Sequence, residues 1–267
     1  MSAGSPTAAK GPRLRTIALP AEHGSWGLTL EPILAGLLVA ASWGGLALGI
    51  AALGAFFLRW PLKMYQTGRR KNRPDRARLA LRFSILYALI GAVALAAVIP
   101  LAGWRPLLPL VMAIPAGILF LVYDAQNKSR NWQAELAGPA AFCSVAAGIA
   151  LAGGWPWVSA MALWAVLAAR SISSILFVRE RIRLDRGRPR QTGLALGAHV
   201  VAILLAAWLS RTTLIPWTLA AVYVLTFLRA AWGLSPFRPK ATLMVIGFTE
   251  LGWSILTLVA LAVGVRL

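Results

Sequence analysis

The chain has 267 residues, of which 59% are hydrophobic and only 13% are charged, and its formal net charge is +19. A soluble domain of this size needs a larger charged share to cover its surface, so these values exclude an ordinary soluble protein. The basic residues form short blocks between apolar segments, a distribution that argues against nucleic-acid binding and favours contact with anionic lipid headgroups.

Apolar stretches long enough to cross a hydrocarbon core of about 30 Å recur along nearly the whole chain. They predict an all-α polytopic bundle of about nine transmembrane helices. We expect a basic cytoplasmic tail at residues 1–18 and a single transmembrane domain at 19–267. The first apolar stretch is interrupted by Glu22, His23 and Glu31, which signal peptides rarely tolerate, so it is assigned to the first span. The predicted spans are 24–41, 44–65, 79–100, 106–123, 135–152, 157–178, 193–210, 214–232 and 241–265.

The connections between the predicted spans alternate in character. Odd connections are short and rich in Gly, Pro and Trp, whereas even ones are basic; of the 27 Lys and Arg residues, only Arg105, Arg211 and Arg266 lie on the odd side. Because basic loops stay in the cytoplasm, the N-terminus and the even loops are predicted to be cytoplasmic. Tryptophans near both ends of the spans, such as Trp104 and Trp132, are typical of aromatic belts. These patterns predict a multi-pass membrane protein, with the lipid bilayer as its partner.

Four charged residues lie well inside the predicted spans, namely Glu31, Arg59, Arg170 and Glu250. A charged side chain at mid-bilayer costs roughly 3 kcal/mol on insertion scales, so these side chains should face the bundle interior. All four fall in the cytoplasmic half of their spans, which predicts one polar cavity open to the cytoplasm. The alternative is that pairs such as Glu31–Arg170 or Glu250–Arg59 are interhelical ion pairs that only fix the packing.

Helical spacing extends this polar set, because residues three, four or seven positions apart share a helix face. The resulting stripes are His23, Gly27 and Glu31 in the first span, Arg59 and Lys63 in the second, and Arg170, Ser174, Phe177 and Arg181 in the sixth. A capping or packing role for His23 is as good an interpretation as proton transfer. The basic blocks at 69–82 and 179–190 also serve as topology determinants.

Motifs for cofactor chemistry are not apparent. The sequence shows no Gly-rich phosphate loop, nucleophile elbow or metal-binding His/Cys cluster, so neither a cofactor nor a metal is expected. Cys143 is the only cysteine and lies in an apolar segment, which predicts a buried hydrophobic side chain and excludes an internal disulfide.

Three stretches resemble one family of bacterial membrane proteins, the YwiC-like family. They are LPAEHGSWGLTLEPILAGLL at 19–38, YDAQNKSRNWQAELAGPAAF at 123–142 and RSISSILFVRERIR at 170–183. The family has no settled activity, so this resemblance implies a multi-pass protein of the bacterial cytoplasmic (inner) membrane without implying a reaction.

The expected architecture is also similar to the UbiA prenyltransferase superfamily, with nine helices, a cytoplasmic N-terminus and polar cytoplasmic loops over a central cavity. Tyr123, Lys128, Gln133 and Gly138 resemble that superfamily's loop between helices 4 and 5. The resemblance implies a magnesium-bound isoprenyl diphosphate held by Asp-rich motifs at the ends of helices 2 and 6. Here the end of helix 2 has no acid before Asp75, and the end of helix 6 offers only Glu180 and Asp185. Arg and Lys could instead hold a phosphate directly.

The leading hypothesis is therefore a UbiA-like bundle that binds an anionic amphiphile, such as an isoprenoid or lipid phosphate. The candidate ligand-binding residues are Arg59, Lys63, Tyr123, Lys128, Arg170, Ser174, Arg179, Arg181 and Glu250. His23 and Glu31 are the candidate catalytic, proton-transferring residues if chemistry occurs, and whether the protein is an enzyme stays open. The alternatives are a proton-coupled secondary transporter or exporter using Glu31 and Glu250, and a non-catalytic membrane assembly protein.

Overall fold

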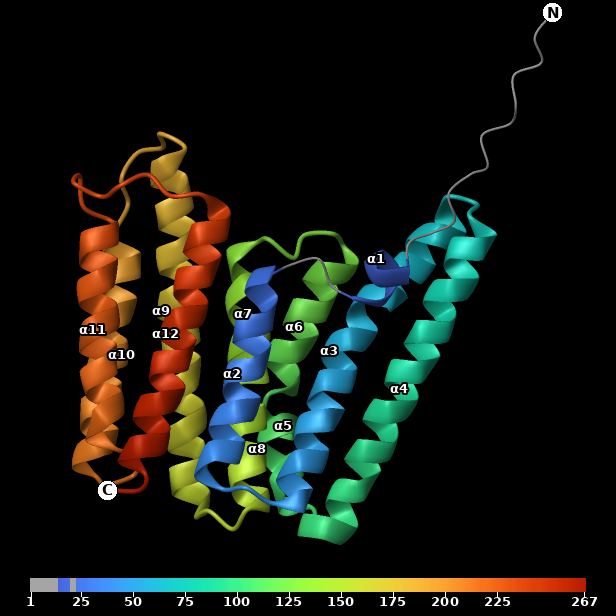
Figure 1. Ribbon diagram of the computed structural model, residues 1–267, viewed down its shortest axis with the longest axis horizontal. Coiled ribbons are helices and arrows are strands. Elements are labelled where there is room, and N and C mark those ends of the chain that lie inside the picture. The colour runs from blue at the N-terminus through green and yellow to red at the C-terminus, as the bar shows by residue number, and fades with distance from the viewer. Residues whose placement is uncertain (1–13, 20–22) are drawn as a thin grey trace, which may run out of the picture.

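The computed structural model describes residues 14–19 and 23–267, and within those ranges all regular structure is helical (Figure 1). The expected all-α fold is thus confirmed. The elements are α1 (Leu14–Ala18), α2 (His23–Val39), α3 (Trp43–Arg70), α4 (Pro74–Ala102), η1 (Arg105–Leu107), α5 (Leu108–Met112), α6 (Ile114–Ala125), α7 (Trp132–Phe142), α8 (Ser144–Ala152), α9 (Trp157–Asp185), α10 (Gly193–Arg211), α11 (Trp217–Gly233) and α12 (Leu243–Gly264).

Six of these segments in the described part of the chain are long and apolar enough to cross a membrane. They are α3, α4, the α7–α8 pair, α9, α10 and α12, and the bent pair formed by η1–α5 and α6 adds a seventh if it is one span. The apolar parts of α2 and α11, Trp26–Val39 and Trp217–Gly233, are shorter. Since a span needs about 20 apolar residues, length and composition establish a multi-pass membrane protein with fewer certain crossings than the nine predicted.

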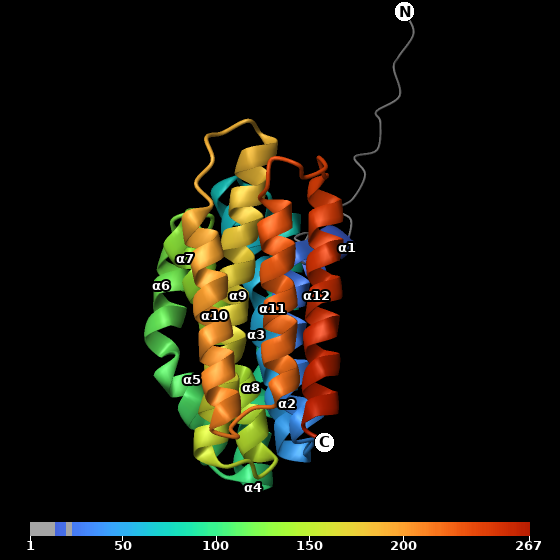
Figure 2. The ribbon, with the colours of Figure 1, turned by 90° about the vertical axis from the view of Figure 1, so that its left-hand side faces the viewer.

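The helices run side by side along the bundle, and α1 and the C-terminus lie at opposite ends (Figures 1 and 2). In Figure 1, α10 and α11 form one flank, α3 and α4 form the other, and α2, α7, α9 and α12 lie between them. The main core joins α8–α11 around Leu163, Val166, Leu167 and Tyr223. This arrangement places the middle of α9 inside the bundle.

Helices α3 and α4 pack very closely because two glycines face one another. A Cβ atom built on Gly54 would lie 2.8 Å from the Cα of Gly91, which is closer than real Cβ atoms approach backbone. Small residues allow this kind of close helix contact in membrane proteins. On its other side α4 exposes large apolar side chains, including Leu89 at 59% and Val93 at 68%, as expected for a surface covered by lipid.

The segment between α4 and α7 is bent by 49° where α5 meets α6. Pro115 lies at the start of α6, and it has no N–H to donate to the preceding turn. The missing hydrogen bond explains why the helix is interrupted at this point and why α5 and α6 differ in direction.

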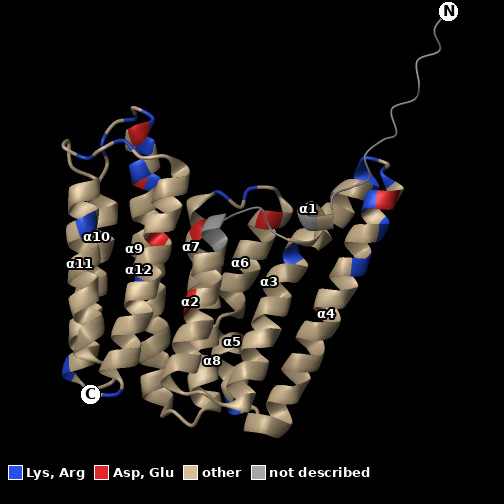
Figure 3. Ribbon diagram, in the orientation of Figure 1, with Lys and Arg blue, Asp and Glu red and all other residues tan. Residues whose placement is uncertain are grey.

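Charged residues are distributed unequally between the two ends of the bundle. Figure 3 shows most Lys and Arg residues at the end that carries α1 and the connections α3–α4, α6–α7 and α9–α10. We call this the basic end. The opposite end carries the short connections α2–α3, α8–α9 and α10–α11.

Candidate functional site: a buried ladder of ion pairs

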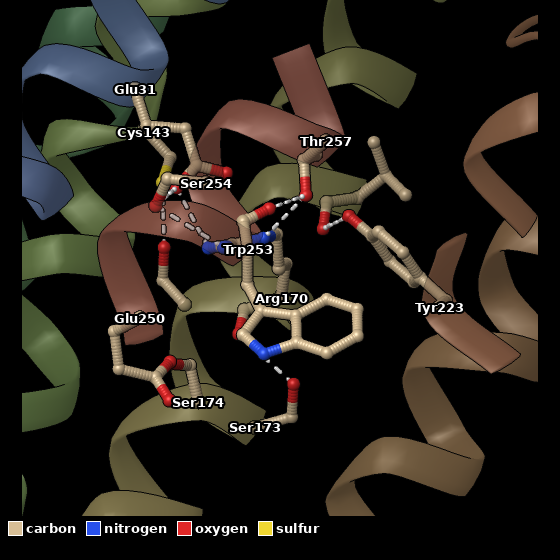
Figure 4. Close-up of polar contacts among 12 residues, drawn as sticks. Glu31, Cys143, Arg170, Ser173, Ser174, Tyr223, Glu250, Trp253, Ser254 and Thr257 are labelled. Atoms are coloured by element: carbon tan, nitrogen blue, oxygen red, sulfur yellow. Dashed lines mark hydrogen bonds and ion pairs between the residues drawn. The ribbon is translucent and has the colours of Figure 1, made fainter. Parts of the chain in front are cut away.

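The middle of the bundle contains a polar cluster built on Arg170. Its Nη1 donates to Oε2 of Glu31 at 2.7 Å, its Nε to Oγ1 of Thr257 at 2.8 Å and its Nη2 to Oγ of Ser254 at 3.2 Å (Figure 4). Ser254 also donates to Oε2 of Glu31, at 2.7 Å. We call Glu31, Arg170, Ser254 and Thr257 the central cluster. It joins α2, α9 and α12, so each helix supplies part of one hydrogen-bonded unit.

Both charged members of the central cluster are removed from the surface. The side chains of Arg170 and Glu31 are 4% and 3% exposed. Glu31 lies at the midpoint of α2, eight residues from either end. Its Oε1 atom has no hydrogen-bond partner among the residues that the structure describes. A buried carboxylate oxygen without a donor is costly, so this atom is a natural place for a proton.

A second set of polar contacts lies one helical turn nearer the basic end. Ser174, four residues after Arg170 on α9, donates to Glu250, four residues before Ser254 on α12. Glu250 also accepts from Arg229 of α11. The guanidinium of Arg229 lies over Phe177, 4.0 Å from the ring centroid, which adds a cation–π contact. Ser174, Glu250 and Arg229 therefore form a second layer, which we call the upper layer.

A third layer closes the basic end of α9. Arg181 pairs with Asp185 at 2.9 Å, and Arg238 pairs with the other oxygen of Asp185 at 3.2 Å. Arg181 also donates to the carbonyl oxygen of Gly233 at 3.0 Å, at the C-terminus of α11. Helix ends leave carbonyls without intrahelical donors, so this arginine also caps α11.

A separate ion-paired group joins α3 to α6. Arg59 donates to Asp124 through Nε at 3.0 Å and Nη2 at 3.1 Å, and Lys63 approaches the same carboxylate at 3.2 Å. Arg59 also lies over Phe120, 4.9 Å from the ring centroid. The side chains of Arg59 and Lys63 remain 27% and 30% exposed. We call Arg59, Lys63 and Asp124 the α3–α6 cluster.

The remaining candidate residues lie at the basic end. Arg179 of α9 pairs with Glu135 of α7 and also donates to the carbonyl of Arg130, at 3.1 Å. The Lys128 side chain is exposed, and its backbone N–H donates to the carbonyl of Tyr123 at 2.8 Å. His23 begins α2, but its side chain lies outside the described residues.

The structure therefore divides the candidates into separate groups. Glu31, Arg170, Ser174 and Glu250 stack together along α9, and the acid that contacts Arg170 is Glu31. Arg59 pairs with Asp124, and Glu250 pairs with Arg229, so the alternative of a Glu250–Arg59 pair is wrong. The reason is position: α12, which carries Glu250, is separated from α3 in Figure 1 by α2.

The polar cavity expected around these charges is not supported by the described residues. A cavity of about 350 Å³ lies instead against α6, α7 and α9, with Met112, Ala116, Ala140, Met161, Trp164 and Ala168 among the residues that line it. All of its lining residues are apolar or small. Such a groove suits a hydrocarbon chain better than a phosphate.

Several contributing residues were missed by reasoning from the sequence, among them Ser254, Thr257, Arg229 and Asp124. Glu250, Ser254 and Thr257 repeat at i, i+4 and i+7 on α12, a helical stripe that was available as a signal. Arg229 and Asp124 lie near the predicted ends of their spans, where a charge is unremarkable. Over residues 14–19 and 23–267, no three His, Cys, Asp or Glu side chains come together in a way that could hold a metal ion.

Comparison with known proteins identifies one family. The family model described as YwiC-like protein matches residues 19–150, about half of the chain, and this confirms the resemblance seen in the stretches at 19–38 and 123–142. The third stretch, at 170–183, lies beyond the matched region. No curated protein and no solved structure matches the chain.

Proposed function

We propose that this YwiC-like chain is a nine-span protein of the bacterial inner membrane that binds the phosphate group of an anionic amphiphile at its basic end. The nine spans follow if α2, α11 and the bent pair all cross the bilayer. The concentration of Lys and Arg at one end supports a cytoplasmic basic end and N-terminus. Residues 19–267 would then form one transmembrane domain with UbiA-like architecture.

The observation that carries this proposal is the partial exposure of the two cations in the α3–α6 cluster. Arg59 and Lys63 both contact the carboxylate of Asp124, and their side chains remain 27% and 30% exposed. The two residues lie in the half of α3 nearer the basic end, 11 and 7 residues before the helix ends at Arg70. A phosphate oxygen could approach the exposed side of Lys63 without displacing Asp124, because an ammonium group has three N–H donors. Tyr123 and Lys128, close to Asp124 in sequence, would lie at the rim of the site.

Other arginines from the candidate set are less suited to a headgroup. Arg170 already directs its donors at Glu31, Ser254 and Thr257, and Arg179 is paired with Glu135. A phosphate at Arg170 would have to displace Glu31 in the bundle interior, where an unpaired carboxylate is costly. We therefore assign the headgroup to Arg59 and Lys63, with Arg181 and Arg238 as a smaller contribution.

Magnesium-dependent prenyl transfer is not part of this proposal. Asp124 accepts from Arg59 and Lys63, and Asp185 accepts from Arg181 and Arg238. Divalent ions require several oxygen ligands that are close together, and these carboxylates are each occupied by two cations. The amphiphile would be held by nitrogen donors, and its apolar chain would suit the groove beside Trp164.

The test is mass spectrometry of lipids retained by the purified full-length protein. We expect an anionic phospholipid or isoprenoid phosphate to be enriched on the wild type and lost from the double variant Arg59→Gln/Lys63→Gln. Arg105→Gln, at the opposite end of the bundle, is the matched control and should keep the ligand. Binding of vesicles containing phosphatidic acid, compared with inorganic phosphate alone, separates a lipid headgroup from a free anion. Equal retention by all three proteins would contradict the proposal.

A second candidate function is proton-coupled transport, and the buried Glu31 is the observation that favours it. Polar residues that can ionise inside a membrane protein often mark proton or ion pathways. Pro32 directly follows Glu31 within α2, and a proline leaves a backbone carbonyl of the preceding turn without its usual donor. Solute uptake driven by a pH gradient in proteoliposomes, lost in Glu31→Gln, would support this function over amphiphile binding alone.

A further inference from the structure

The central cluster and the upper layer contain two acids and two arginines in consecutive helical turns. Glu31 and Glu250 approach α9 from α2 and α12, while Arg170 and Arg229 belong to α9 and α11. Ser254 and Glu250 are four residues apart on α12, about 6 Å along the helix axis. The four charges cancel, so the group as a whole is neutral in the apolar interior.

Two buried side-chain atoms of this group, Oε1 of Glu31 and Nε of Arg229, have no hydrogen-bond partner among the described residues. Glu31 is 3% exposed, and its Oε1 atom receives no hydrogen bond from any described residue, whereas Oε2 receives two. The other ionisable groups that surround it are Arg170 on α9, Glu250 on α12, Cys143 between α7 and α8, and Tyr223 on α11. Arg170 donates to Oε2 of Glu31, Ser254 and Thr257 rather than to Oε1. Tyr223 donates to the carbonyl of Val166 at 2.8 Å. An oxygen in this position can be satisfied by a proton of its own.

We propose that Glu31 is a proton-binding site at the centre of the membrane, and that Glu250 passes protons between it and the basic end. The site is distinct from the α3–α6 cluster and does not depend on amphiphile binding. In the transfer step the carboxyl group of Glu250 gives up its proton, and the carboxylate of Glu31 becomes a carboxylic acid. Glu250 then returns to its ion pair with Arg229 and its hydrogen bond from Ser174.

Charge balance limits the group to one proton at a time. One proton leaves a single arginine without its acid, and a second would leave both Arg170 and Arg229 uncompensated in a low dielectric. The hydrogen bonds from Arg170 to Ser254 and Thr257 hold the guanidinium in place while Glu31 is neutral. Arg170 is thus a positioning residue in this step, and the proton moves between the two carboxylates.

Infrared difference spectroscopy of the full-length protein in phosphatidylcholine nanodiscs tests the binding site directly. The carbonyl stretch of a protonated carboxylic acid should appear as the pH is lowered, and Glu31→Gln should remove that band. Glu135→Gln is the matched control, because Glu135 is also ion-paired but is 29% exposed, and it should leave the band unchanged. If Glu31→Gln does not accumulate, Glu31→Asp should retain a titrating band at a shifted frequency. Identical spectra for wild type and Glu31→Gln, or the same band frequency in Glu31→Asp, would overturn the site.

A separate measurement tests the role of Glu250 as the proton carrier. After a rapid drop in pH, the Glu31 band should appear about tenfold or more slowly in Glu250→Gln than in the wild type, because a positioned proton carrier has been removed. The conservative variant Glu250→Asp should recover part of the rate. An unchanged rate in Glu250→Gln would leave Glu31 as a proton site and overturn the role of Glu250. Neither result depends on whether Arg59 and Lys63 bind a headgroup.

Discussion

The Nη1 atom of Arg170 lies 2.7 Å from Oε2 of Glu31, although the two residues are 139 positions apart in the chain. Their contact joins the middle of α2 to the middle of α9, where neither side chain reaches water. In such surroundings the attraction between the charges is offset by the cost of removing them from water. The pair therefore need not stabilise the fold strongly, whereas the loss of one partner should be costly.

The first prediction concerns this pair. Arg170→Gln and Glu31→Gln should each lower the free energy of unfolding by about 3–5 kcal/mol, because each leaves an uncompensated buried charge. The double variant should recover a large part of that loss. Maleimide labelling of Cys143 during heating in detergent measures the effect, since this single cysteine is 1% exposed and reacts only after unfolding. Additive losses in the double variant would show that the pair is not coupled.

Topology gives a second prediction. A reporter that is active only outside the cytoplasm should be active when fused after Arg105 or Arg211. It should be silent after Asp75 or Arg186, which lie in the basic connections. Enzyme activity in intact cells measures the result, with reporter protein levels as the control. The opposite pattern at both sets of sites would reverse the orientation and contradict a cytoplasmic headgroup site.

The contact between α3 and α4 leads to a third prediction. Gly54→Ala should destabilise the protein by about 1–3 kcal/mol, because the new methyl group would meet the backbone of Gly91. Gly117→Ala is the control, because a Cβ at Gly117 meets nothing within 4 Å. That variant should be neutral or slightly stabilising. Thermal unfolding of both variants, followed by Cys143 labelling, separates a close-contact effect from a general effect of replacing glycine.

The α3–α6 cluster gives a fourth prediction. Arg59→Lys should weaken the interaction between α3 and α6 by about 1 kcal/mol, because lysine cannot make the bidentate contact with Asp124. Lys63→Arg keeps the charge and should have little effect. Amide hydrogen exchange near residues 120–125, measured by mass spectrometry, reports the change. Faster exchange in Lys63→Arg than in Arg59→Lys would contradict this ranking of the two cations.

Much of the helical framework was predictable from the sequence because apolar runs determine where spans can form. The predicted spans at 44–65 and 157–178 correspond to Trp43–Arg70 and Trp157–Asp185. Both helices continue past the apolar residues into basic sequence, since a helix need not end at the membrane surface. Hydropathy therefore located the crossings better than it located the helix ends.

The arrangement of the charges was only partly predictable. Helical periodicity places Arg170 and Ser174 on one face, but it does not identify the neighbouring helix that supplies the acid. The partner depends on which helices are adjacent, and that is a property of the whole bundle. For the same reason Arg229, near the predicted end of its span, gave no sign that it would contact Phe177 and Glu250.

The hydrogen bond between Ser254 and Glu31 joins residues 223 positions apart, and this separation has a consequence for biosynthesis. Synthesis proceeds at about 5–20 residues per second, so Glu31 is made roughly 10 s or more before its partners on α12. Helix α2 thus emerges from the ribosome with an acid at its midpoint and neither Arg170 nor Ser254 available. Its final insertion is therefore expected to be a late step, completed when α9 and α12 arrive. A chain truncated before α9 should leave α2 accessible to cleavage by added protease, whereas the full-length chain should protect it.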